Sequence, residues 1–330
     1  MRAESLPRKI GSVDTTLGSV RHPDGVIRPV DASVSRFRGW IVSEAPREQL
    51  DMMCVAAHEE THALQAYYPY VILQRAGRTA DDFTRFTMYT VDGNRGVLVR
   101  RLRDFLDEIP SVAIVEDKVP TALRSDRYDP YIRNREAHDG VFGLLDEFDA
   151  YYQTVHTAYD LYGYVRDELP DDGQTWKSYL ELLGMSYSDA YAEFRYFVLV
   201  YMTTLKGQDP QLYQRLMDDG GVPTAFTLID TAFTDLAKAA RLRVREEIPG
   251  LLQSRGYRVT TRDSDTPVGS ASGTSINATY LDIRGEDGRF QGSIWLESPL
   301  STLLGEETAK PVYQAMLLEL RRAAQTGTLP

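Results

Sequence analysis

Two histidines four residues apart are the part of this sequence best suited to chemistry. His58 and His62 lie in a stretch whose apolar spacing predicts a helix. At about 100° per residue, both imidazoles fall on one helix face, one turn apart, where they can bind the same metal ion. Glu59 is rotated by about a quarter-turn, so its carboxylate can reach a water molecule on that metal. The pattern therefore indicates a metal site with a general base beside it.

Residues 55–66, with their H-E-x-x-H motif, resemble the metal helix of the zincin metallopeptidases. The resemblance implies a zinc ion, a bound water activated by Glu59, and a peptide or protein substrate. In the metzincin branch a glycine and a third histidine follow, and here Gln65 and Tyr68 stand at those positions. The aspzincin branch uses a downstream aspartate, and Asp160 stands in a similar run of residues at a different spacing. The gluzincin branch, in which a second helix supplies a glutamate, fits best.

Glu147 matches the third ligand that the gluzincin branch requires. It precedes Ala150 by three residues in an apolar stretch, as in the ligand helix of many gluzincins. Helical spacing also places mostly small residues on the face that carries Glu147, namely Gly140, Gly143, Ala150, Tyr151, Thr154 and Ala158. Such a face allows close helix approach, and a buried lone carboxylate is costly unless a cation pairs with it. Four rivals stay open as the third ligand: Glu193, Glu136, His138 and Asp160.

Hydrolysis also needs a donor for the oxyanion that forms when water attacks a carbonyl. Gluzincins often use a tyrosine or a histidine for this purpose. Tyr151 lies one turn beyond Glu147 on the same predicted face and is the first candidate. His156 is nine residues from Glu147, which turns it to about the opposite side of an ideal helix, so we interpret it as structural.

Helices must position these residues. We predict a helix over residues 46–68 that Pro69 ends. Apolar spacing predicts further helices at about 79–88, 96–108, 135–165, 174–205, 223–247 and 309–324. Residues 1–42 indicate short strands and turns, and after residue 250 the pattern becomes β-like. There we expect a strand at 257–262 and a hairpin of 276–284 with 289–297.

The expected fold is α+β and mostly helical. It comprises a zincin-like domain at 1–250, with short N-terminal strands, and a small α+β C-terminal module at 251–330. Two functions fit this arrangement: a zinc-dependent peptidase of the gluzincin type, or a catalytically inactive zincin-like protein that binds or scaffolds. A third hypothesis assigns the binding to the C-terminal module.

The composition limits the partners. The 330 residues carry a net charge of −11, which argues against nucleic acid because no basic field offsets phosphate repulsion. No apolar run is long enough to span a bilayer. The single cysteine, Cys54, is expected in the core rather than on the metal. Without an apolar signal region near its start, the sequence as it stands predicts a cytoplasmic protein, whereas removal of a leader would make it an exported one.

Overall fold

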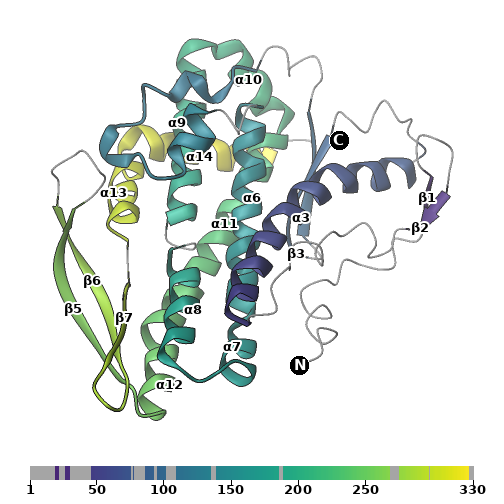
Figure 1. The fold of residues 1–330 in the computed structure, drawn as a ribbon. Helices are drawn as coiled ribbons and strands as arrows, with labels where there is room; N and C mark the ends of the chain where they lie inside the picture. The colour runs from purple at the N-terminus through teal and green to yellow at the C-terminus, as the bar shows by residue number, and fades with distance from the viewer. Residues whose placement is uncertain are drawn as a thin grey trace.

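The computed structural model describes residues 19–21, 27–29, 46–75, 77, 86–92, 95–101, 109–134, 139–185, 189–267, 275–296 and 298–326. Over these residues the fold is α+β and mostly helical, as predicted. They form antiparallel sheets of two, two and three strands around a group of packed helices (Figure 1). The first sheet pairs β1 (Ser19–Arg21) with β2 (Ile27–Pro29), in agreement with the short strands expected there.

The helix that carries the histidine motif, α3, is longer than predicted. It spans Pro46–Arg75 and continues through Pro69, so the prediction that this proline ends the helix is wrong. A proline inside a helix leaves the carbonyl four residues earlier without its helical partner. That carbonyl belongs to Gln65 and accepts a hydrogen bond from Thr87 Oγ1 at 3.5 Å. A neighbouring strand therefore supplies the bond that the helix loses.

This strand belongs to a hairpin where we predicted helices. β3 (Phe86–Asp92) pairs with β4 (Arg95–Arg100), so the predicted helices are wrong over 86–88 and 96–100. In β4, Val97 and Val99 are buried and their neighbours are more exposed, which is the period of two of a half-buried strand. β3 packs against α3 and the central helix α6 (Val141–Asp160).

α6 is the helix around which the others pack. It contacts α3, α9 (Tyr191–Gln208) and α11 (Gly221–Leu242). Phe148 of α6 lies among the rings of Tyr191, Phe226 and Phe233, at centroid distances of 5.7 to 6.3 Å. Gly140 directly precedes the helix, its φ is +62°, and a Cβ there would lie 2.6 Å from the Pro110 carbonyl oxygen. Only glycine fits this start without strain.

The other predicted helices are present with different boundaries. The helix expected at 135–165 divides into α6 and α7 (Tyr162–Glu168), and that at 174–205 divides into α8 (Gly173–Met185) and α9. α10 (Pro210–Asp219) was not predicted, and the helix expected at 223–247 is α11, a π turn at Arg243–Glu247, and then α12 (Ile248–Ser254). Between β4 and α6 the chain forms short turns at Val112–Val115, Thr121–Leu123 and Asp129–Arg133.

The predicted C-terminal hairpin is confirmed. β5 (Arg258–Pro267), β6 (Ser275–Arg284) and β7 (Phe290–Trp295) form an antiparallel sheet in chain order, and β7 packs on α8. α13 (Pro299–Thr308), which was not predicted, and α14 (Pro311–Thr326) return to the helices, where α14 contacts α9 and α11. Buried apolar residues from Leu50 to Leu320 form one cluster, and the boundary at residue 250 stays a prediction.

Two expectations from the composition can be compared with the described residues: the burial of Cys54 and the lack of a stretch that could span a membrane. Cys54 is 1% exposed and lies in the core, as expected. None of the helices in the described part of the chain combines the length and apolar character needed to cross a membrane.

Candidate metal centre

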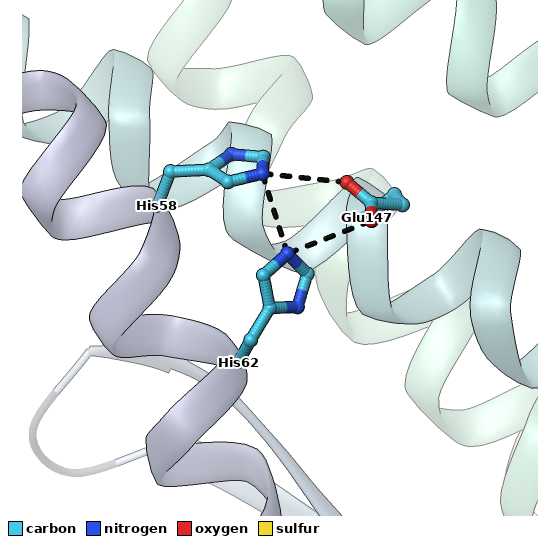
Figure 2. A group of neighbouring side chains, drawn as sticks. All are labelled: His58, His62 and Glu147. Carbon is cyan, nitrogen blue, oxygen red and sulfur yellow. Dashed lines mark hydrogen bonds and ion pairs between the residues drawn. The ribbon is translucent and has the colours of Figure 1, made fainter. Parts of the chain in front are cut away.

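Side chains from α3 and α6 converge where these helices pack together. His58 and His62 project from α3, and Glu147 projects from α6 toward the space between them (Figure 2). Glu147 Oε2 lies 3.4 Å from His58 Nε2, and Glu147 Oε1 lies 3.5 Å from His62 Nε2. The two Nε2 atoms are 3.3 Å apart. Within the described ranges this is the one group of three His, Cys, Asp or Glu side chains with such convergence.

These separations suit a small tetrahedral cation. With ligand bonds of about 2.0–2.1 Å, a tetrahedral ion holds its ligands about 3.3–3.4 Å apart. The 3.3 Å between the two Nε2 atoms agrees with that spacing, and each Nε2 lies 3.4 or 3.5 Å from a different oxygen of the Glu147 carboxylate. Two imidazole nitrogens and one carboxylate form a donor set that zinc prefers. The site also leaves access for a fourth ligand, because the side chain of His62 is 30% exposed.

One oxygen of the Glu147 carboxylate makes no hydrogen bond within the described part of the chain. This atom, Oε2, is buried. Burial alone would raise the pKa of this carboxyl, but the two neighbouring imidazoles outweigh burial and lower the pKa to about 2. The group is therefore an anion at neutral pH. A buried anion with an unused oxygen is costly unless a positive charge lies beside it.

The Glu147 carboxylate also changes the pKa of His62. Burial disfavours the imidazolium, yet the hydrogen bond to Glu147 and the negative charges of Glu147, Asp146 and Glu59 raise the His62 pKa. A divalent cation at the same place would neutralise more of this negative charge than a proton on His62 would.

A polar contact next to the site sets the spacing of α3 and α6. Gln65 lies about one turn beyond His62, and its Nε2 donates to Asp149 Oδ2 at 3.0 Å. The backbone N–H of Thr90 in β3 donates to the same oxygen at 3.2 Å. Burial raises the pKa of Asp149 to about 7 in spite of these two bonds. The residue that excludes the metzincin pattern, Gln65, thus joins the histidine helix to the glutamate helix.

Glu59 and Tyr151 lie beside the three converging side chains. Glu59 is half-buried on α3, close enough for its charge to raise the pKa of His62. The Tyr151 ring meets the His58 ring edge-on, with centroids 4.7 Å apart. Its hydroxyl lies 3.1 Å from the hydroxyl of Tyr131, and the guanidinium carbon of Arg127 lies 4.8 Å from its ring centroid. Either hydroxyl can donate in this contact, and when Tyr131 donates, the Tyr151 proton is available to an oxyanion.

The rival third ligands lie elsewhere or outside the described residues. Glu193 is fully buried on α9, and its Oε2 accepts from Arg127 Nη1 at 2.7 Å. Asp160 is exposed at the end of α6, 3.9 Å from His156 Nε2, and the ring of His156 stacks on Tyr152. Glu136 and His138 lie outside the described residues.

Several residues around the site were not singled out from the sequence. They are Thr154, Gln65 as a helix-spacing contact, Asp149, and the pair of Arg127 with Tyr131. Thr154 lies on the predicted face of α6, so the helical pattern could have indicated it. Arg127 and Tyr131 come from an irregular segment before α6, and no periodicity relates that segment to the site.

Comparison with protein-family models finds no match for this chain, and neither the comparison with curated proteins nor that with solved structures finds one. The functional interpretation therefore rests on the residues and geometry of the site.

Proposed function

We propose that this chain is a zinc-dependent hydrolase of the gluzincin type that cleaves peptide bonds. One observation carries the proposal: the Nε2 atoms of His58 and His62 lie 3.3 Å apart, and each lies 3.4 or 3.5 Å from one oxygen of the Glu147 carboxylate, so all three side chains face a common point. In this proposal His58, His62 and Glu147 hold the zinc, and the partly exposed side chain of His62 leaves the fourth position open. A bound zinc ion would lower the pKa of a water molecule to about 7 and polarise a substrate carbonyl.

The remaining residues then have distinct tasks. Glu59 follows the first ligand directly, accepts the proton of the attacking water and passes it to the leaving amine. Tyr151 donates its hydroxyl to the oxyanion of the substrate. Gln65 and Asp149 hold the two ligand helices at a fixed separation. Because the catalytic groups are half-buried or buried, water around the scissile bond would be limited, which strengthens these interactions.

The test uses the Glu59→Gln variant with Glu60→Gln as its matched control. Zinc per chain is measured by elemental analysis, and cleavage is measured on a library of internally quenched peptides. We expect about one zinc per chain in all three proteins. Glu59→Gln should lose at least about 100-fold in cleavage because a general base contributes roughly 10²–10⁴-fold. Glu60 points away by another 100° or so, and its variant should cleave like the wild type.

Three outcomes would contradict the proposal. Zinc content near zero in protein never exposed to chelator removes the metal site. Full cleavage by Glu59→Gln removes the assigned base. One zinc per chain without cleavage of any library peptide favours the alternative of a zincin-like protein that binds or scaffolds.

A further inference from the structure

Thr154 is the residue of α6 that contacts the outer nitrogen of His58. It lies two turns beyond Glu147, and its Oγ1 is 3.4 Å from His58 Nδ1. The same Oγ1 donates to the carbonyl oxygen of Ala150, at 2.9 Å within the helix. Thr154 is 9% exposed, so water does not compete strongly for its hydroxyl.

The hydroxyl can only accept from the histidine. A threonine hydroxyl carries one proton, and here that proton is directed to Ala150. The contact with His58 therefore needs the proton on Nδ1 of the imidazole. A neutral His58 in this tautomer presents a lone pair at Nε2, the nitrogen that points at Glu147 in Figure 2.

This tautomer accounts for the unused oxygen of Glu147. In this tautomer His58 Nε2 and Glu147 Oε2, which lie 3.4 Å apart, both present lone pairs. A cation between them would be attracted by both atoms. The contact from Thr154 thus favours the tautomer of His58 that can bind a metal ion through Nε2.

We propose that Thr154 is a positioning residue that fixes the metal-binding tautomer and ring orientation of His58. This inference rests on the proposed zinc site. It identifies Thr154, which is not itself a ligand, as a residue on which the zinc affinity of the site depends. Outer partners of this kind typically change metal affinity by about 10–100-fold. Because the contact is long and neutral, we expect the Thr154→Val variant to lose about 10-fold in zinc affinity.

The experiment compares the full chain with Thr154→Val, Thr154→Ser and Thr157→Val. Valine keeps the shape of threonine without its hydroxyl, and serine restores the hydroxyl. Thr157 is equally buried on the same helix, so its variant controls for the loss of any hydroxyl from α6. Zinc affinity is measured by competition with a chromophoric chelator. The ring protons of the five histidines are followed by long-range ¹⁵N–¹H spectra of the metal-free protein.

The expected result is weaker zinc binding by Thr154→Val alone, and recovery in Thr154→Ser. The metal-free wild type should show the His58 proton on Nδ1, and Thr154→Val should show a mixture of both tautomers. Equal affinity of Thr154→Val and wild type would overturn the inference and leave the zinc site intact. A wild type that binds no zinc would contradict the proposed function, and the tautomer spectra would then decide separately on Thr154.

Discussion

Two buried glutamates on neighbouring helices face very different partners. Glu147 on α6 faces two imidazoles, whereas Glu193 on α9 faces the guanidinium of Arg127. Burial acts against the charge of both. It is outweighed at Glu147, whose pKa falls to about 2, but it prevails at Glu193, whose pKa is raised in spite of Arg127. Tyr151 touches both groups, since its ring contacts His58 on one side and Arg127 on another.

The two glutamates differ in whether their partners can release a proton and offer a lone pair to a metal ion. An imidazole can release its proton and offer a lone pair, so the Glu147 group can exchange protons for a metal ion. A guanidinium keeps its charge at any ordinary pH and offers no lone pair, so the Glu193 pair is closed to metals. Both glutamates lie on apolar helices, and burial alone does not distinguish a ligand from a structural ion pair.

The largest expected effect is the loss of metal from the Glu147→Gln variant. The substitution keeps the shape but removes the anion that we propose as the third zinc ligand. We expect zinc affinity to fall by more than the roughly 100-fold that an outer partner can cost. Competition with a chelator measures it, and Glu193→Gln is the matched control that should keep wild-type affinity. Metal loss from the control instead would exchange the roles of the two glutamates.

The second-largest expected effect concerns Tyr151, whose ring contacts both His58, beside Glu147, and Arg127, the partner of Glu193. Tyr151→Phe keeps the ring contacts with His58 and Arg127 but removes the proposed oxyanion donor. We expect kcat to fall by about 10²–10³-fold with zinc content unchanged. Tyr131→Phe loses the same 3.1 Å bond between the hydroxyls but keeps the Tyr151 donor, so its kcat should stay within a few-fold of wild type. Equal losses in both variants would assign the effect to the hydrogen bond and not to catalysis.

The Glu193→Gln variant, which breaks the ion pair with Arg127, should destabilise the fold without changing zinc affinity. Removing one partner of a buried ion pair typically costs about 3–5 kcal/mol. Arg127 is 24% exposed, so water relieves part of that cost, and we expect about 3 kcal/mol. Chemical denaturation in the presence of chelator measures the free energy of unfolding. Glu247→Gln, in an ion pair 43% exposed at the glutamate, should change it by less than about 1 kcal/mol.

The sequence predicted the convergence of His58, His62 and Glu147 better than it predicted the elements around them. The pair of histidines depends only on helical spacing, and the third residue, Glu147, could be chosen because its helix carries small residues on one face. The strands at 86–92 and 95–100 were missed because short apolar runs such as residues 97–99 fit a buried helix as well as a strand. The pairing of Glu193 with Arg127 joins residues 66 positions apart and leaves no periodic signal. Pro69 was misjudged because its compensation comes from Thr87, on a different element.

The smallest expected effect concerns Asp189, a buried carboxyl near Glu193, and tests whether burial or ion pairing determines its pKa. Asp189, just before α9, is buried with Oδ1 unpartnered, and burial raises its pKa to about 6 despite a bond from Ser298. Since the folded pKa lies above the unfolded value of 3.8, the native state binds more protons between about pH 4 and 6. The Asp189 carboxyl therefore lowers the free energy of unfolding as pH rises from about 4 to 6. Above that range the loss of stability remains.

Asp189→Asn should accordingly stabilise the protein at pH 7 by about 2 kcal/mol and should make little difference at pH 4. Denaturation of both proteins across pH 4–8 measures the difference. Asp235→Asn, at a carboxyl 71% exposed, should show no such pH dependence. A constant difference between wild type and Asp189→Asn at all pH values would mean that the carboxyl stays ionised in the fold. In that case Arg127 would be shared between Asp189 and Glu193, and the Glu193 group would be an ion cluster rather than a pair.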